Sequence, residues 1–243
     1  MKIGILKTDD VRSQWVDKYG EYSDMFIELL RSADPALTFV VYEVQHGQYP
    51  ASIDDVDAYI ITGSKRSVYE DIPWIHQLAE FVRTLAAAQK KLVGVCFGHQ
   101  LIAHALGGKT EKSDKGWGVG RHTVRLSDRA LKSIGGEQDF NLLVSHQDQV
   151  TIPAKGAEVL ATSDFCSYAI CQIGNHILSF QGHPEFNVDY SRELLNLRVD
   201  KYSRQCYQQG IDSLELPLDT QRAAQWIVDF IREPKTSETI TIN

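Results

Sequence analysis

The sequence predicts an α/β fold in which a doubly wound, mostly parallel sheet carries a small antiparallel extension. In the first half of the chain, short apolar runs alternate with segments whose apolar residues recur at helical spacing, a pattern typical of parallel strands joined by crossover helices. In the second half, strand-like segments follow one another with few helices between them. Sheets of this class place their sites at the carboxyl ends of the strands.

The first half contains the elements expected for the parallel part of the sheet. Four strands are predicted from apolar or β-branched runs, at residues 2–6, 37–43, 58–62 and 92–95. Three helices are predicted from helical periodicity, at residues 22–31, 74–88 and 100–106. Pro73 opens the second of these helices, and Gly107-Gly108 ends the third.

The second half supplies the antiparallel extension and two closing helices. Five strands are predicted at residues 119–126, 141–145, 158–161, 168–173 and 176–181, with Gly174-Asn175 as a two-residue hairpin turn between the last two. One helix is expected across residues 189–207, and another from a cap at Asp219 or Thr220 to about Ile231. Residues 1–232 are therefore expected to form one domain, followed by a polar, frayed tail at 233–243.

Composition and charge disfavour several classes of function. The net charge of −7 disfavours nucleic-acid binding, and the absence of a basic amphipathic segment or an 18-residue apolar run disfavours a membrane role. The four cysteines show no CxxC spacing, and the N-terminal apolar run is too short for a signal peptide, so a cytoplasmic location is expected. No metal or nucleotide cofactor is expected, because there is neither a ligand cluster nor a Gly-x-x-x-x-Gly-Lys loop.

The strongest candidate for a catalytic residue is Cys96. A strand of buried type runs into it, Gly94 and Gly98 flank it at two residues' distance, and a helix follows. This arrangement is a nucleophile elbow with a thiol, in which a strained turn exposes the side chain and the glycines leave room for it. The helix N-terminus favours the thiolate, and the backbone N–H of Phe97 is expected to face the oxyanion. The alternative is an inert cysteine at a glycine-rich turn.

His183 is the candidate base. It follows a predicted strand, with Gly182 before it and Pro184-Glu185 after it, and Glu185 stands close enough in sequence for its carboxylate to reach the imidazole. A thiol nucleophile requires a base, and that base requires an acceptor that orients it. A single histidine at a strand end is more often structural, but its combination with the cysteine elbow favours a catalytic pair.

Together, Gly-Val-Cys-Phe-Gly-His-Gln at residues 94–100 and Gly-His-Pro-Glu at residues 182–185 resemble the class I glutamine amidotransferase family. The resemblance spans roughly residues 2–186, and the family includes the glutaminase domains of GMP synthase, anthranilate synthase and carbamoyl-phosphate synthetase. It implies a flavodoxin-like fold with glutamine as nitrogen donor. It also implies a γ-glutamyl thioester on Cys96, with His183 as general base and then acid, and Glu185 orienting it.

A second segment resembles the oxyanion loop of this family. Residues 60–65, Ile-Ile-Thr-Gly-Ser-Lys, stand where the family has a strand followed by a loop that often reads Ser-Gly-Gly-Pro. Ser64 and Lys65 replace the second glycine and the proline here. The resemblance therefore implies an N–H donor at Gly63 or at Ser64, whereas the alternative is an ordinary turn after a strand.

The resemblance also implies substrate-binding residues. Val-Ser-His-Gln-Asp at residues 144–148 resembles a Ser-His-x-Asp segment that contacts the α-amino and carboxylate ends of glutamine, which makes Ser145 and His146 candidates. Gln100, on the first turn after the elbow, is the matching side chain on the helix. Residues 63–71 are closer to stand-alone, GMP-synthase-like amidotransferases and to plant γ-glutamyl peptidases than to the synthase domains.

Three functions are consistent with these residues. The first, and the primary expectation, is a glutaminase that passes ammonia to a separate synthase subunit or acceptor, because the two helices and tail after Glu185 leave no room for a synthase domain. The second is a hydrolase of γ-glutamyl amides or peptides that passes nothing on. The third is a non-catalytic binding module, against which the intact Cys96 and His183 argue. Tolerance of a larger leaving group separates the first two functions.

Overall fold

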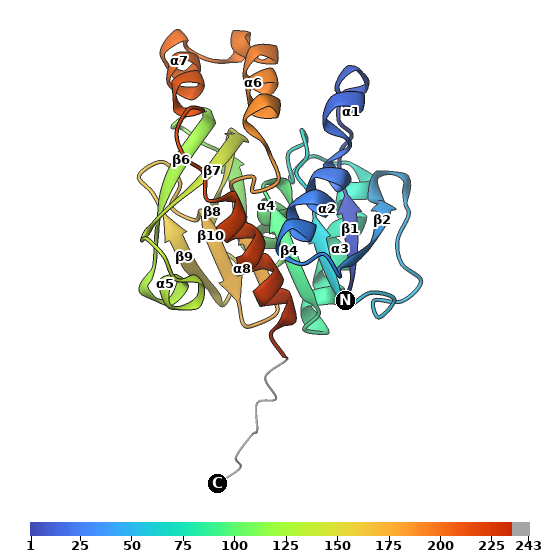
Figure 1. Cartoon of the computed structure of the whole chain (residues 1–243). Coiled ribbons are helices and arrows are strands. Elements are labelled where there is room, and N and C mark those ends of the chain that lie inside the picture. Colours follow the sequence, from blue (N-terminus) through green and yellow to red (C-terminus); the bar gives the residue numbers. More distant parts are fainter. Residues whose placement is uncertain (235–243) are drawn as a thin grey trace.

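The computed structural model describes residues 1–234, so the tail expected at 233–243 lies outside the described residues except for its first two. A nine-stranded mixed sheet has the strand order β2-β1-β3-β4-β11-β10-β9-β6-β7 (Figure 1). Its parallel part consists of β2 (Thr38–Glu43), β1 (Lys2–Lys7), β3 (Ala58–Ile61), β4 (Lys91–Val95) and β11 (Ile177–Phe180). Its antiparallel part consists of β10 (Ile170–Ile173), β9 (Ala157–Thr162), β6 (Gly118–Leu126) and β7 (Asp139–His146). The predicted α/β fold, with a parallel core and an antiparallel extension, is confirmed.

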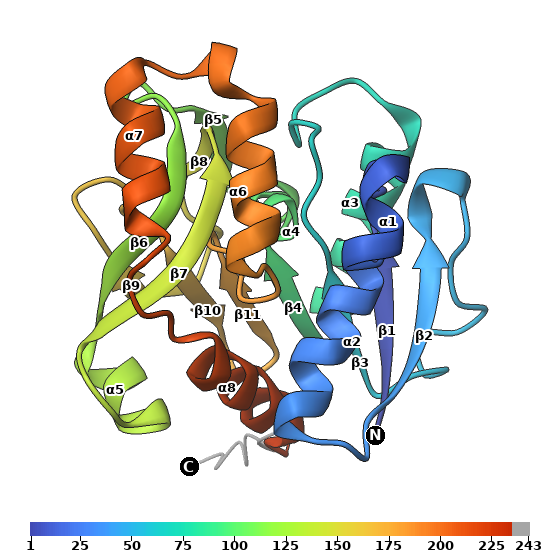
Figure 2. The ribbon, with the colours of Figure 1, turned by 45° about the horizontal axis from the view of Figure 1, so that its top comes forward.

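Helices cover both faces of the sheet, and three more lie along one edge of it. On one face lie α2 (Tyr22–Ala33), α5 (Asp128–Ile134) and α8 (Thr220–Arg232); on the other lie α3 (Pro73–Ala87) and α4 (Phe97–Ala105). Beyond the carboxyl ends of the parallel strands lie α1 (Ser13–Tyr19) and α6 (Val188–Leu197), and α7 (Arg204–Ser213) lies beside α6 against β6 of the antiparallel part (Figure 2). Short 3-10 turns occupy Val44–His46 and Val199–Lys201, and the separate pair β5 (Lys109–Lys112) and β8 (Asp148–Ile152) forms a small ribbon. None of the described helices is long and apolar enough to cross a membrane.

Three apolar clusters hold these layers together. The first packs α2 and α8 against the sheet, and the second packs α3 and α4 against its other face. The third joins α1, α6 and α7 to the edge of the sheet through residues such as Phe186, Tyr190 and Leu194. Burial of these apolar side chains therefore fixes the three helices on the side of the sheet where the parallel strands end and a site is expected.

Several predicted boundaries were wrong. The helix expected across residues 189–207 is broken into α6, a 3-10 turn and α7, because Ser203 is extended and its hydroxyl caps α7 by accepting the N–H of Cys206. The turn between β10 and β11 spans three residues, 174–176, instead of two. Neither the seven-residue helices α1 and α5 nor the ribbon of β5 and β8 was expected, since such short elements show too few residues for a periodic pattern.

Replacing Trp226 of α8 with alanine tests the first cluster. The indole is 4% exposed and lies edge-on to Phe140 and Phe180, with ring centroids 5.9 and 5.4 Å away. Loss of such a buried aromatic ring costs about 3–5 kcal/mol of unfolding free energy. Urea unfolding should show this loss for Trp226→Ala, whereas Gln225→Ala, at an exposed neighbouring position, should change stability by less than about 0.5 kcal/mol. Equal stability of the two variants would contradict this packing.

Candidate active site

Three neighbouring parallel strands end at the site. β4 lies between β3 and β11, with Ile61 beside Gly94 and Phe180 beside Val95. Because the three strands point the same way, the segments that follow them meet at one edge of the sheet. These segments carry Gly63, Cys96 and His183.

The backbone at Cys96 makes the sharp turn of a nucleophile elbow. Its φ of 52° and ψ of −100° are strained for a residue with a side chain. A Cβ on Gly94 would lie 2.7 Å from the backbone of Gly98, and a Cβ on Gly98 would lie 2.6 Å from the carbonyl oxygen of Ile61. Only glycine at both positions lets α4 begin this close to the strands. Helix α4 thus starts at Phe97, directly after the thiol.

The structure brings His183 and Glu185 together beside this thiol. Nδ1 of His183 lies 2.7 Å from Oε1 of Glu185, with both side chains buried, and the imidazole stacks on Phe186 with ring centroids 3.9 Å apart. The backbone N–H of His183 donates to the carbonyl of Leu143 at 2.8 Å. The contacts with Glu185 and Phe186 give the ring one orientation, with Nε2 left for the thiol.

Electrostatics favour the charged form of this histidine. Burial alone would lower the pKa of His183, but the charges of Glu185 and Cys96, and its hydrogen bonds to both, raise it to about 10. An imidazolium beside a thiolate is the resting form that a cysteine nucleophile requires.

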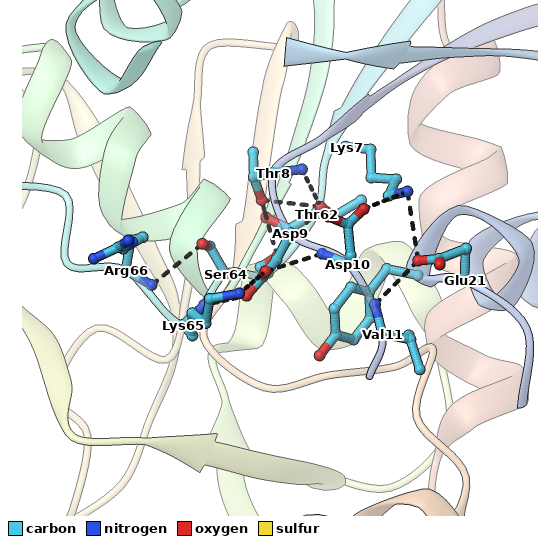
Figure 3. A network of polar contacts seen from close by, with 12 residues as sticks. Lys7, Thr8, Asp9, Asp10, Val11, Glu21, Thr62, Ser64, Lys65 and Arg66 are labelled. Atoms are coloured by element: carbon cyan, nitrogen blue, oxygen red, sulfur yellow. Dashed lines mark hydrogen bonds and ion pairs between the residues drawn. The ribbon is translucent and has the colours of Figure 1, made fainter. Parts of the chain in front are cut away.

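The loop after β3 is tied to the end of β1. Thr8 donates its hydroxyl to the carbonyl of Gly63 at 2.8 Å, and Asp9 accepts both the backbone N–H of Lys65, at 2.8 Å, and its Nζ, at 2.6 Å (Figure 3). A Cβ on Gly63 would lie 2.9 Å from Cε1 of His183, so this position also requires glycine. Ser64 lies between these anchors and accepts the N–H of Arg66 on its hydroxyl at 3.2 Å. Neither Thr8 nor Asp9 was predicted, although an aspartate directly after a parallel strand is a recognisable signal.

The predicted substrate-binding residues border the same space. Gln100 donates its Nε2 to the carbonyl of Asp148 at 2.8 Å and to Oε1 of Gln181 at 3.1 Å. His146 also bonds the carbonyl of Asp148 through Nδ1, and burial and His122 lower its pKa to about 3, so the ring is neutral. Ser145 accepts a hydrogen bond on its hydroxyl at 2.8 Å from Nη1 of a residue that was not predicted, Arg198.

Two cavities meet at Cys96. The larger, about 230 Å³, extends over Gln100 and the segment of Ser145 to Asp148. The smaller, about 20 Å³, lies on the side of His183 and is walled by Tyr22, Phe186, Leu194 and Arg198. A third and much larger hollow of about 1100 Å³ runs along α7 beyond Trp117, but Cys96 does not line it. Within residues 1–234, no three or more His, Cys, Asp or Glu side chains form a group that could hold a metal ion.

Comparison with known proteins identifies the family of the chain. A family model described as glutamine amidotransferase class-I matches residues 14–199. A glutamine amidotransferase-like protein of Schizosaccharomyces pombe is 32% identical over 245 residues, covering 95% of this chain and 98% of that protein. Gamma-glutamyl peptidase 2 of Arabidopsis thaliana is 27% identical over 229 residues, covering 90% and 91%. The crystal structure of a glutamine amidotransferase from Methylobacillus flagellatus has the same fold, with a TM-score of 0.73 at 19% identity over 95% of this chain and 93% of that one. The chain belongs to the class I glutamine amidotransferase family.

Proposed function

We propose that this protein hydrolyses the γ-amide bond of glutamine or of a related γ-glutamyl compound through a thioester on Cys96, without waiting for a partner subunit. The observation that supports this most is the assembled site: the thiol, its base and its orienting carboxylate are in contact, and the oxyanion loop is already tied down by Thr8 and Asp9. A glutaminase that depends on docking has reason to leave that loop misdirected, because ammonia released without an acceptor is wasted.

In the proposed reaction, His183 starts as the imidazolium, and the sulfur of Cys96 attacks the amide carbon as a thiolate. The oxyanion accepts hydrogen bonds from the backbone N–H of Phe97 and from that of Gly63 or Ser64. His183 then donates its proton to the leaving nitrogen, and the amine departs as the thioester forms. In the second half, His183 removes a proton from water and the hydroxide attacks the thioester. The carbon–sulfur bond breaks, glutamate is released, and the thiolate is restored beside the imidazolium.

Gln100 is proposed to bind the α-amino group of the glutamyl unit. Both hydrogens of its Nε2 are used within the protein, on Asp148 and on Gln181. Only its Oε1 remains for the substrate, and a carbonyl oxygen accepts hydrogen bonds from an ammonium group. His146 reaches the same carbonyl of Asp148, so its proposed contribution is to hold that segment while Ser145 faces the substrate.

The leaving group must lie on the side of His183, which protonates it. The cavity there, about 20 Å³, has room for a molecule the size of water or ammonia. This size favours glutamine, a primary amide, over γ-glutamyl peptides. The similarity to gamma-glutamyl peptidase 2 supports the second candidate, a γ-glutamyl peptidase, for which the wall formed by Tyr22 and Leu194 would have to open. Measuring kcat/KM of the isolated chain on glutamine and on γ-glutamyl dipeptides decides between them, and silence on all of them until a synthase is added would refute both.

Replacing Cys96 with alanine should abolish hydrolysis, because no thioester can form. Its thermal transition should stay within a few degrees of the native one, since the change removes only the sulfur atom and leaves the backbone of the elbow in place. A glutamine analogue carrying an electrophile should label Cys96 and spare Cys206, the half-buried thiol on α7. Peptide mass spectrometry that located the label mainly on Cys206, Cys166 or Cys171 would show that the nucleophile is elsewhere.

Replacing Glu185 with glutamine should move the pH profile as well as lower the rate. The carboxylate raises the pKa of His183, so removing its charge lowers that pKa. His183 must be protonated to release the amine, and activity therefore falls as pH rises through its pKa. The alkaline limb of kcat/KM should thus lie at lower pH in Glu185→Gln than in the native protein, with a loss of roughly 10²–10⁴-fold at neutral pH. An unchanged alkaline limb would remove Glu185 from this role.

Replacing Asp9 with alanine should release the oxyanion loop. Asp9 is 3% exposed and its carboxylate holds Lys65 at two points, so the N–H groups of Gly63 and Ser64 lose their fixed direction. One well-placed oxyanion donor is worth about 10²–10³ in kcat, so kcat should fall by up to that factor while KM changes little. Asp10→Ala is the matched control, because Asp10 pairs with Lys7 and makes no contact with the loop. A similar fall in kcat in both variants would indicate a general loss of structure instead.

A further inference from the structure

We infer that Arg198 is a carboxylate-binding residue that anchors the γ-glutamyl substrate and sets the specificity of the site. This inference rests on the proposed function and extends it to the recognition of the charged end of the substrate. Arg198 ends α6, and its side chain lines both cavities that meet at Cys96. It is the one cation apart from Lys65 that borders both of these cavities within the described residues.

The guanidinium is held in place but not neutralised. Its Nη1 donates to the hydroxyl of Ser145 at 2.8 Å, and its carbon lies 5.8 Å from the ring centroid of Trp117. Within residues 1–234 it forms no ion pair with a carboxylate. A half-buried guanidinium in this state offers a fixed fork of donors with which a carboxylate can pair bidentately.

The other cations around the site differ from Arg198. Lys65 is paired with Asp9 at 2.6 Å, and Arg66 is paired with Glu70 at 3.2 Å. Lys201 is exposed at the rim of the larger cavity and, like Arg198, forms no ion pair with a described residue. The unsatisfied positive charge therefore gathers at the end of α6, in a protein whose net charge is −7.

A carboxylate is the anion that this site would meet. Every γ-glutamyl compound carries an α-carboxylate, and a γ-glutamyl peptide carries a second carboxylate on its leaving group. Because Arg198 borders the cavity on the side of Gln100 and also the one on the side of His183, either carboxylate can reach it. A pairing of this kind lowers the free energy of the bound substrate and of the transition state together, so it acts mainly on KM.

The test compares Arg198→Met and Arg198→Lys with the native protein on four substrates. These are glutamine, γ-glutamyl methylamide, γ-glutamyl-glycine, and 4-aminobutanamide, which is glutamine without its α-carboxylate. If Arg198 binds the α-carboxylate, Arg198→Met should lose roughly 10- to 100-fold in kcat/KM on the first three and stay unchanged on 4-aminobutanamide, with Arg198→Lys between them. If it binds the carboxylate of the leaving group instead, Arg198→Met should lower kcat/KM only on γ-glutamyl-glycine. Either pattern supports the inference.

Arg192→Met is the matched control, since Arg192 lies on the same helix, pairs with Glu215 and lines neither cavity at Cys96. An equal loss on all four substrates, or no loss on any, would overturn the assignment. Binding separates this result from a failure of the proposed function. In a Cys96→Ala background, calorimetry with γ-glutamyl-glycine, which carries both carboxylates, should show binding that weakens by the same factor on Arg198→Met, even if the native chain hydrolyses none of the four compounds. Equal affinity for γ-glutamyl-glycine with and without Arg198 would refute the inference on its own.

Discussion

The close approach of α4 to the strands beneath it is the constraint on which the rest of the site depends. Gly94 and Gly98 allow this approach, and the chain must then reverse within a single residue, Cys96. The strained conformation costs about 1–3 kcal/mol, and the surrounding packing has to stabilise it. Because α4 packs against both β4 and the end of β3, the position of the thiol is fixed relative to the loop at Gly63. The same contact therefore determines where the nucleophile lies relative to the oxyanion loop.

A comparison of four histidines shows why only His183 among them carries a positive charge. Burial lowers the pKa of His99 and of His122 to about 4 and that of His146 to about 3, so these rings are neutral. His183 is as deeply buried, yet its pKa is raised, because Glu185 and Cys96 bring negative charge to it. Burial supplies a low-dielectric setting, and the neighbouring anions decide which histidine can carry a proton in it.

The sequence predicted the parts of the site that are local along the chain. Cys96 with its two glycines, and His183 with Glu185, lie in short segments whose chemistry can be recognised without knowing what packs on them. Asp9 lies far from these segments in sequence, and Arg198 is separated from Glu185 by α6; they reach the site only through the order of the strands and the placement of α6. Arg198 was further concealed because residues 189–207 were expected to form one helix, whereas the chain breaks directly after it. The role of each predicted site residue stays a prediction until activity is measured.

Helix α6 couples the size of the leaving group to the recognition of the substrate. Leu194, in the wall of the small cavity, and Arg198 are four residues apart and therefore lie on the same side of the helix. The base of α6 is held by Tyr190, whose hydroxyl lies 2.8 Å from that of Tyr22 and whose ring packs edge-on against Phe186. Any movement of α6 that enlarges the space beside His183 must disrupt this aromatic packing, and it must also displace Arg198. A form of the protein that admits peptides would thus place its guanidinium differently from a form that admits only glutamine, so leaving-group tolerance and carboxylate binding cannot be tuned independently.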